Sequence, residues 1–524
     1  MRQKRGTPLP EESLFTGLGD LPYQDLKTAR HKGGFELDPE AGECRVSATD
    51  FLIDVSAVAK GLIATGIAPG DRLILACGAR YEWAVVAFAA WAVRAVVVPV
   101  SPFSSAGHLQ HVIRDTQPAA AIVERAHHSR AVAQLRREFH ILTRAWHLDA
   151  PLASGPRKDP GIEAIKKTGV YMDRSAVLSR RQEATRNDIA LIAHPTTGKT
   201  APRGVVLTHG NLLASASSMV GRVRPLLNAI PADEASVLMA LSPASVFGQC
   251  LLTACVMAGV RVGFPPGPSS SPEEDLQRFA PTIVMASPSF LEEVYTNEEA
   301  AEAEKASKPG WDNLKAFNAA VEHAVEFGRS GRRAVWRRLS HAMHEWLYAR
   351  VRSCLGERAR VIVCTGQIPE RLAHFYTGVG MPVVQGFGLP ETSGPFTLNV
   401  GGESPGGPGG TVRSPIPAVQ VRVSPDHEVE VRGDTVFRGY WNAPEATRRA
   451  FREGWLRTGL IGRLAPEGLV VLRPDIHQSA PTPPPAAPTG PPTAPEPPPP
   501  ERKTGPEAPL PPVGSPEQAP WPRG

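Results

Sequence analysis

Between residues 50 and 124, segments with the apolar spacing of a helix alternate with short, almost wholly apolar segments of strand length. The helical spacing is seen in residues 51–66, 81–95 and 108–117, and the apolar runs are DRLILAC, VVVPV and AAAIVE. A strand without polar alternation is covered on both faces, and strands that alternate with helices pair in parallel. The sequence therefore predicts an α/β fold with a mostly parallel sheet between two layers of helices.

The same alternation returns in the middle of the chain. Further apolar runs lie at residues 236–242, 260–264, 282–287, 360–364 and 382–386, and GQCLLTACVMAG has helical spacing. The stretch from Thr296 to Leu355 is predicted to be a helical insertion whose charges form a solvated face. A period of two in VQVRVSPDHEVEVRGDTVF predicts an antiparallel hairpin or a small β-barrel-like part.

Length and composition divide the chain into three parts. A chain of 524 residues exceeds one ordinary core. Residues 1–48 have weak periodicity and predict a loosely structured lead-in, whereas residues 49–478 carry the alternating pattern. Because 19 of the last 46 residues are proline, residues 479–524 are predicted to be a disordered, proline-rich tail that buries no core.

Charge and cysteine content exclude several classes of protein. The net charge of +5 is small for this length, which argues against a nucleic-acid partner. The six cysteines form no C-x-x-C pair, as expected in a reducing compartment without a disulfide framework. The most apolar segment, residues 83–93, is too short to span a bilayer, and the N-terminus has no apolar signal segment. These features predict a cytoplasmic protein.

The stretch AHPTTGKTAPRGVVLTH comes close to the P-loop pattern, but a P-loop leads directly into a helix. Here Pro202 and Gly204 follow, and the β-branched run after them predicts a strand. What remains is a loop between two strands, rich in donors and cations that can surround phosphate. These residues are Thr196, Thr197, Gly198, Lys199, Thr200 and Arg203. A surface turn without phosphate affinity is the alternative.

Four motifs, in the same order, resemble the acyl-adenylate-forming (AMP-binding) superfamily in its long-chain fatty acid–CoA ligase branch. They are the loop above, GFGLPETS at 386–393, VRGDTVFRGYWNAPEAT at 431–447 and EGWLRTGLIGRLAPEG at 453–468. The resemblance covers roughly residues 50–475 and implies the large α/β adenylate-forming domain of that family. It also implies the chemistry: a carboxylate attacks the α-phosphate of ATP, giving acyl-AMP and pyrophosphate, and the thiol of coenzyme A then displaces AMP.

The resemblance also implies roles for single residues. Thr197, Arg203 and Glu391 are expected to be catalytic, with Arg203 in the place of a family lysine. Glu391 is further expected to hold Mg²⁺ against the phosphates, because a carboxylate suits this hard cation; a solvated loop glutamate is the alternative. The residues expected to bind the cofactor are Thr196, Gly198, Lys199, Thr200, Gly366, Gln367, Phe387, Gly388 and Thr392.

Individual positions leave alternatives. Phe387 replaces the tyrosine that stacks on adenine in the family and keeps the stacking face. Gln367 is expected to bond the edge of the adenine ring, and a plain turn is an equal alternative. His209 and Asn211 match the family pattern, yet we favour a helix N-cap at Asn211 over a ligand role. Ser245 replaces a histidine that lines the acyl pocket in the family.

Several positions depart from the family. Leu460 stands where the family carries an aspartate that grips both ribose hydroxyls, and Pro390 replaces a threonine that contacts phosphate. Pro195 removes one backbone donor from the loop. Residues 472–478 replace the family's hinge, so we expect the C-terminal lid domain with its catalytic lysine to be absent.

Three functions follow. The first is ATP-dependent activation of a long-chain fatty acid, or another carboxylic acid, to acyl-AMP and acyl-CoA at a reduced rate. The second is a catalytically inactive homologue that binds an acyl chain, a nucleotide or a protein partner. The third is a scaffold whose tail binds a partner, as proline-rich segments do. The expected cofactors are ATP, Mg²⁺ and coenzyme A as co-substrate. A peripheral membrane contact stays open, and the tail's partner is unknown.

Overall fold

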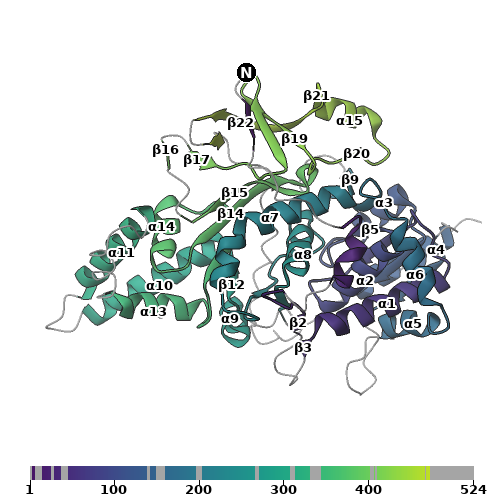
Figure 1. Ribbon diagram of the computed structural model, residues 1–524, viewed down its shortest axis with the longest axis horizontal. Coiled ribbons are helices and arrows are strands. Elements are labelled where there is room, and N and C mark those ends of the chain that lie inside the picture. The colour runs from purple at the N-terminus through teal and green to yellow at the C-terminus, as the bar shows by residue number, and fades with distance from the viewer. Residues whose placement is uncertain are drawn as a thin grey trace, which may run out of the picture. The chain divides into compact units, whose positions relative to one another are not determined.

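Three β-sheets and the helices that cover them make up the described part of the computed structural model (Figure 1). The structure describes residues 3–5, 15–24, 29–36, 45–138, 142–148, 160–195, 203–265, 271–306, 313–330, 344–401, 406–407, 410–465 and 468–471. All of these residues belong to one compact unit, Met1–Gln478. Within them, no helix is both long and apolar enough to cross a membrane.

The first sheet contains the N-terminal alternation of helix and strand. Its strands, in spatial order, are β20 (Gly439–Tyr440), β9 (Val205–Thr208), β8 (Ile189–Ala193), β5 (Val96–Pro99), β4 (Arg72–Ala76), β6 (Ala120–Val123) and β7 (Arg144–His147). Its helices are α1 (Ala48–Ala64), α2 (Tyr81–Ala92), α3 (Ala106–Thr116), α4 (Ala126–Glu138), α5 (Pro160–Thr168) and α6 (Arg174–Gln182). Strands β8, β5, β4, β6 and β7 are parallel, and β9 and β20 extend the edge antiparallel.

Both faces of this sheet are buried, as its continuous apolar runs predict. In β4, Leu73 and Leu75 belong to a core that includes α1 and α2, whereas Ile74 and Ala76 belong to a second core that includes α3 and α4. A parallel strand between two helical layers has no solvated face, so polar alternation would place polar groups in a core. The predicted helices and strands of residues 50–124 are therefore confirmed.

The second sheet repeats this arrangement, and its longest strands lie at one edge. Its strands, in order, are β15 (Gly394–Val400), β14 (Val383–Leu389), β13 (Val361–Cys364), β12 (Ile283–Ala286), β10 (Ser236–Leu238), β11 (Arg261–Gly263), β2 (Phe35–Glu36) and β3 (Arg45–Val46). Its helices are α7 (His209–Ala229), α8 (Val246–Ala258), α9 (Pro272–Phe279), α10 (Pro288–Ala306), α11 (Asn313–Ser330), α13 (Glu345–Cys354) and α14 (Glu370–Gly378). The inner strands from β2 to β14 are parallel, and the outer strands β15 and β3 are antiparallel.

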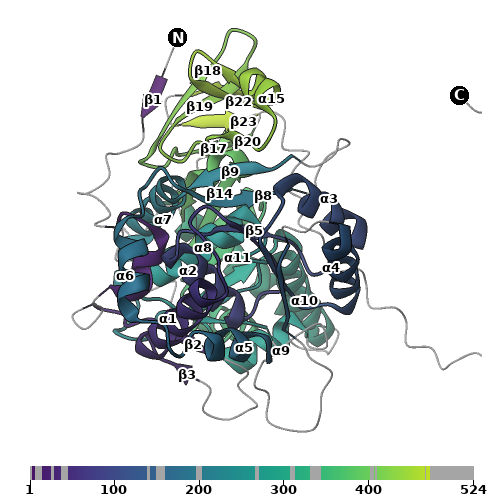
Figure 2. The same ribbon diagram turned by 90° about the vertical axis from the view of Figure 1, so that its right-hand side faces the viewer.

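The third sheet is antiparallel and contains the segment with a period of two (Figure 2). Its strands are β1 (Gln3–Arg5), β18 (Val419–Val423), β19 (Glu428–Gly433), β22 (Trp455–Leu464), β23 (Leu469–Val471), β17 (Gly410–Arg413) and β16 (Gly406–Gly407), with β21 (Phe451–Arg452) on β22 and α15 (Pro444–Ala450) beside it. The predicted hairpin is β18–β19, in which Val419 pairs with Gly433 and Val423 with Val429. The α/β class with a mostly parallel framework and a smaller antiparallel part is confirmed.

Part of the N-terminal lead-in belongs to the fold, which corrects the expectation of a loosely structured segment. The 3-10 helix η1 (Leu18–Tyr23) has Leu18 and Leu21 fully buried, and β2 adds to the second sheet beside β11. Such short elements have no measurable periodicity, and their burial depends on partners far along the chain.

The charged insertion is also more than a solvated face. Of the expected range 296–355, residues 307–312 and 331–343 lie outside the described residues, and the rest forms α10, α11 and α13. Arg350 of α13 forms an ion pair with Glu298 of α10 at 2.6 Å and a second with Glu302, which is 2% exposed. These charges join two helices, because a buried carboxylate requires a partner.

Candidate active site

The expected phosphate loop connects two strands, as its sequence predicts, with β8 before it and β9 after it. Residues 196–202, which include Thr196, Thr197, Gly198, Lys199 and Thr200, lie outside the described residues. Their roles therefore stay predictions, whereas the two ends of the loop can be described.

Asp115 and Trp441 hold the two ends of this loop. Before the loop, the fully buried side chain of His194 places its Nε2 2.8 Å from Oδ2 of Asp115. After the loop, the N–H of Trp441 donates to the carbonyl of Gly204 at 2.7 Å, and its Nε1–H donates to the carbonyl of Asp115 at 3.0 Å. Both ends of the loop are therefore connected through Asp115 and Trp441, a link that the sequence did not reveal.

Glu391 lies directly after β14, on the 3-10 turn η3 (Pro390–Thr392), and is half-buried. The hydroxyl of Tyr440 donates to its Oε1 at 2.8 Å. Burial, and then the charge and hydrogen bond of Glu391, raise the pKa of Tyr440 above its ordinary value, so this hydroxyl keeps its proton and stays a donor. The guanidinium of Arg203, an exposed residue, lies 5.8 Å from the centre of the Tyr440 ring.

Strand pairing brings these three residues together from three separate motifs. Tyr440 of β20 pairs with Val205 of β9, two residues after Arg203. The N–H of Phe437 donates to the carbonyl of Glu391 at 2.8 Å and fixes the turn against the segment before β20. Sequence reasoning singled out Arg203 and Glu391 but missed Tyr440, although Tyr440 lies inside the quoted motif VRGDTVFRGYW.

Phe387 is buried, and its ring is already covered. It is 2% exposed, the guanidinium carbon of Arg413 lies 4.1 Å from its ring centre, and Phe396 meets it edge-on at 5.6 Å. An exposed ring face for adenine, as the sequence predicts, is therefore not present in this conformation.

Two further residues that the sequence predicts to bind the cofactor, Gly388 and Thr392, lie at the end of β14 and in the turn after it. Thr392 is fully buried, and its hydroxyl accepts from the Leu389 N–H at 2.9 Å, which closes the turn that carries Glu391. Gly388 lies against the backbone of Gly394, where a side chain would not fit. These two residues shape the turn.

The turn expected beside adenine follows β13. The carbonyl of Gly366 accepts from Nε2 of Gln385 on β14 at 3.0 Å, so the turn is tied to the strand of Phe387. Gln367 is exposed next to it. The described geometry is compatible both with a ligand contact of Gln367 and with a plain turn, so this assignment stays a prediction.

Leu460 lies on a bulge of β22. Because Glu430 pairs with Arg457 and Glu428 with Ile461, residues 458–460 all stand opposite Val429. Leu460 is 6% exposed and belongs to the main core, so an apolar contact fills the position where the family's aspartate is expected.

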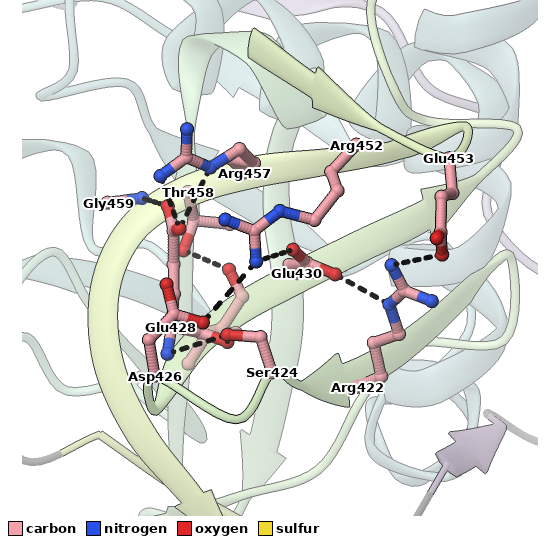
Figure 3. A network of polar contacts seen from close by, with 11 residues as sticks. Arg422, Ser424, Asp426, Glu428, Glu430, Arg452, Glu453, Arg457, Thr458 and Gly459 are labelled. Carbon is pink, nitrogen blue, oxygen red and sulfur yellow. Dashed lines mark hydrogen bonds and ion pairs between the residues drawn. The ribbon is translucent and has the colours of Figure 1, made fainter. Parts of the chain in front are cut away.

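A network of charged side chains supports this bulge from the other face of the sheet (Figure 3). Glu428 accepts from the N–H of Gly459 at 3.0 Å and from Nε of Arg457 at 2.9 Å. The fully buried Glu430 lies between Arg422 at 2.6 Å and Arg452 at 3.4 Å. Buried carboxylates are stable only with such partners, and the contacts of Glu428 hold the turn without a hydrogen bond from the side chain at position 460.

The start of α7 follows β9 directly and has a different cap from the predicted one. Thr208 is the N-cap, and Asn211 is the third helical residue of a reciprocal capping box. The Asn211 amide also donates to the carbonyls of Asp434 and Val436, at 2.7 and 3.0 Å. The prediction of a structural role is thus consistent with these contacts, while the position of the cap was wrong.

His209 is fully buried beside this cap. Its Nδ1 accepts from the N–H of Leu18 at 3.1 Å, which requires a neutral ring. Burial, only partly opposed by the charges of Asp188 and Asp20, lowers its pKa from the ordinary 6.5 to about 4. His209 therefore acts as a neutral core residue that joins η1 to α7.

An apolar cavity lies between α7, α8 and the second sheet. The space between atoms there is about 700 Å³, part of it open to solvent, and the described side chains that line it expose only apolar surface. Representative lining residues are Met219, Val223, Phe247, Leu251, Val384 and Leu398. Ser245 caps the N-terminus of α8, where its Oγ accepts from the Gly248 N–H at 3.0 Å.

This cavity borders the strand that leads to Glu391. Val384 of β14 lines it, and a side chain at Gly386 would meet the ring of Phe247 at 3.2 Å. Ligand sites usually combine an apolar wall with a few polar groups at one end. Strand β14 therefore has an apolar cavity near its middle and the carboxylate of Glu391 after its end.

A magnesium site would rest on Glu391. Among the described residues, no group of three or more His, Cys, Asp or Glu side chains could hold a metal ion. Magnesium in phosphate sites needs just one or two carboxylates, because phosphates and waters supply the other ligands. The hydrogen bond from Tyr440 occupies Oε1, and no hydrogen bond to Oε2 comes from the part of the chain that the structure describes. The Glu391 carboxylate can therefore serve as the single protein ligand that such a magnesium ion requires.

Similarity to known proteins agrees with the fold. The AMP-binding enzyme family matches residues 29–441. The long-chain-fatty-acid–CoA ligase FadD15 of Mycobacterium bovis is 30% identical over 433 residues, which are 82% of this chain and 69% of that protein.

Solved structures show the same fold. The inhibitor-bound N-terminal domain of FACL13 from Mycobacterium tuberculosis has a TM-score of 0.59 at 20% identity, with 87% of this chain and 99% of that chain covered. A fatty acyl CoA synthetase of the same organism has a TM-score of 0.58 at 20% identity, with 87% and 78% covered. The chain therefore belongs to the AMP-binding enzyme family and is a homologue of long-chain fatty-acid–CoA ligases.

Proposed function

We propose that this protein uses ATP and Mg²⁺ to activate a long-chain fatty acid to acyl-AMP and then transfers the acyl group to coenzyme A. One observation carries the proposal: Arg203, Glu391 and Tyr440 converge from three motifs at the end of β14, and the same strand borders an apolar cavity. A substrate with a charged head and an apolar chain requires this combination.

At the phosphates, each described residue has a distinct task. Arg203 supplies a permanent cation, exposed at the end of the loop, and residues 196–200 would add hydroxyl and N–H donors. Glu391 would hold Mg²⁺, which when bound neutralises phosphate charge. The hydroxyl of Tyr440 orients the Glu391 carboxylate through its 2.8 Å bond.

The acyl chain would occupy the apolar cavity. Each buried methylene contributes about 0.8 kcal/mol, so longer chains should bind more tightly until the cavity is filled. The absence of polar groups from the lining favours a plain hydrocarbon chain over a polar carboxylic acid.

The reaction has two steps with balanced bonds. A carboxylate oxygen of the fatty acid bonds to the α-phosphorus of ATP, and the bond to pyrophosphate breaks. The thiol sulfur of coenzyme A, having lost its proton, then bonds to the acyl carbon, and AMP leaves. Charge grows on the phosphate oxygens during the first step, so a cation such as Arg203 stabilises the transition state more than the ground state.

We further propose that the rate is reduced. The aspartate that would accept from the ribose hydroxyls is replaced by the buried Leu460, and Pro390 has no hydroxyl for phosphate. Charge-assisted hydrogen bonds contribute about 1.5–3 kcal/mol each. The loss of one such bond therefore weakens the nucleotide by roughly tenfold to a hundredfold.

A catalytically inactive homologue that binds an acyl chain, a nucleotide or a protein partner is the second candidate. The buried Leu460 and the covered ring of Phe387 favour it, because both affect the same nucleoside contact. It predicts fatty acid binding in the cavity without turnover.

The test is a pyrophosphate-release assay with ATP, Mg²⁺ and fatty acids of increasing length, followed by acyl-CoA detection with coenzyme A. We expect slow turnover whose KM falls by about fourfold per methylene. Val223 lines the cavity, so Val223→Phe should shift the preferred acyl chain length to shorter acids. The control is Arg224→Phe, at the exposed neighbouring residue, which should leave the preferred length unchanged. Fatty acid binding with no turnover would favour the inactive homologue. No binding of ATP or fatty acid would refute the ligase and leave, of the inactive homologue, only a protein that binds a protein partner.

A further inference from the structure

Arg413 is an unusual neighbour for the ring that is expected to bind adenine. It is 4% exposed, at the end of β17, and its guanidinium carbon lies 4.1 Å from the centre of the Phe387 ring. A cation within about 6 Å of an aromatic face is attracted by the ring quadrupole, and the attraction is stronger when both groups are desolvated. Phe387 is 2% exposed, so both groups are away from water.

The ring and the guanidinium lie on the nucleotide side of β14. Successive side chains of a strand alternate between its two faces, so Gln385 shares a face with Phe387, and Val384 has the opposite one. Gln385 donates to the carbonyl of Gly366 at 3.0 Å, in the turn expected beside adenine, whereas Val384 lines the apolar cavity. Arg413 therefore covers Phe387 on the face away from the acyl cavity.

We propose that Arg413 is a specificity-determining residue of the nucleotide site, because its guanidinium occupies the ring face of Phe387 that a purine base needs. A nucleotide stacks on Phe387 after this side chain has rotated away, and its affinity is lowered by the lost contact. The inference rests on the proposed function and deepens it by naming the group that competes with adenine.

Contacts that do not involve its side chain hold the backbone around Arg413. Arg413 pairs with Leu469 of β23, and the N–H of the next residue, Ser414, donates to Oδ1 of Asn399 at 2.9 Å. A rotation of the Arg413 side chain would therefore leave these strand contacts intact. Phe396 packs against the ring edge-on at 5.6 Å and keeps Phe387 in position as its face is uncovered.

The size of the effect follows from the contact that must be broken. A desolvated cation–π contact contributes about 2 kcal/mol, which corresponds to an affinity change of about 30-fold. Loss of the guanidinium should therefore tighten a purine ligand by about 10- to 30-fold. The gain should be at least as large for adenosine as for AMP, because adenosine has no phosphate that senses the lost charge.

The experiment measures adenosine and AMP binding to the full chain by titration calorimetry. Arg413→Ala should tighten both ligands by about 10- to 30-fold, and Arg413→Gln, which keeps part of the packing, should tighten both by a smaller factor and serves if Arg413→Ala does not fold. Arg432→Ala, which removes an exposed arginine of the same sheet, is the matched control and should leave both affinities unchanged. Weaker or unchanged adenosine binding in the Arg413 variants would overturn the inference.

Phe387→Leu separates this inference from the proposed nucleotide site. If Phe387→Leu weakens adenosine but the Arg413 variants do not tighten it, the inference alone is wrong. If Phe387→Leu, made in the Arg413→Ala background where no guanidinium competes for the ring, leaves adenosine and AMP affinity unchanged, the base does not stack on Phe387, and the nucleotide site and the inference are both refuted.

Discussion

The two ends of the proposed nucleotide site differ in how they are built. At the phosphate end, Arg203, Glu391 and Tyr440 form a connected polar group whose members come from separate motifs. At the nucleoside end, Phe387 is covered by Arg413, and Leu460 is packed into the core. The fold is continuous through both ends, but at the nucleoside end the expected stacking face is covered and an apolar side chain replaces the expected ribose acceptor.

This difference shows that the fold and the ligand contacts are maintained by different residues. The bulge around Leu460 is held by the Glu428 carboxylate and by the Thr458 hydroxyl, which donates to the Val429 carbonyl at 2.7 Å. Residue 460 contributes no bond to this bulge through its side chain, so it can become apolar while the turn persists. The turn around Glu391 is likewise closed by a threonine of its own motif, Thr392.

The strongest test of the phosphate end is Glu391→Gln, which keeps the size of the side chain and removes its charge. We expect pyrophosphate release to fall by about a hundredfold or more, because the magnesium ligand that neutralises phosphate charge in the transition state is lost. Glu445→Gln, an exposed glutamate of α15, is the control and should retain the rate. A rate for Glu391→Gln within twofold of the unmodified protein would place the phosphates elsewhere.

The scaffold behind the phosphate end should be sensitive to acid. Burial lowers the pKa of His209 to about 4 from the ordinary 6.5, so the unfolded chain binds this proton at a higher pH than the folded chain. Stability should therefore fall by up to about 3 kcal/mol as the pH drops from 6.5 towards 4. Denaturant unfolding at several pH values measures this change in the free energy of unfolding.

The matched variant is His209→Gln, whose side chain does not titrate. It should lose this part of the pH dependence, although its stability at pH 7 is lower. An identical pH dependence in both proteins would mean that His209 is not the group responsible.

At the nucleoside end, Leu460→Asp should restore an acceptor for the ribose. We expect ATP to bind about tenfold to a hundredfold more tightly by calorimetry, while the free energy of unfolding decreases because Leu460 is 6% exposed. Leu460→Asn introduces a side chain of nearly the same shape as aspartate but without its charge, so it should give a smaller gain in ATP affinity. Equal ATP affinity in all three proteins would show that the ribose does not face this bulge.

The smallest effect is expected for Tyr440→Phe. This change removes the hydroxyl that donates to Glu391 at 2.8 Å and leaves the ring under Arg203. A hydrogen bond to a charged group contributes about 1.5–3 kcal/mol, and water replaces part of it, so Mg·ATP affinity should fall by about tenfold. Tyr171→Phe, at a residue that is 99% exposed, should have no effect. If both changes are neutral, Tyr440 does not orient Glu391.

The elements that the sequence predicted share a local cause. Strands such as β4 and helices such as α2 have apolar patterns that follow from neighbours a few residues away. The hairpin β18–β19 was predictable for the same reason, since its period of two and its turn lie in one segment. The short η1 was not, because Leu18 is buried against residues from distant parts of the chain.

The candidate site likewise contains residues that the sequence could predict and contacts that it could not. Arg203 and Glu391 could be singled out because each lies in a motif whose residues are adjacent in sequence. The contact of Tyr440 with Glu391, the pair of His194 with Asp115 and the cover of Arg413 over Phe387 all join distant segments. The roles of residues 196–200 stay predictions.

By itself, the sequence determined the class of fold, the order of the elements and the family, because these depend on periodicity and on contiguous motifs. The tertiary structure alone decided which side chains meet: Tyr440 with Glu391, Arg413 with Phe387, and Leu460 with the core. The physical reason is that a hydrogen bond or a ring contact requires separations of a few ångströms, which depend on how whole sheets pack rather than on spacing along the chain.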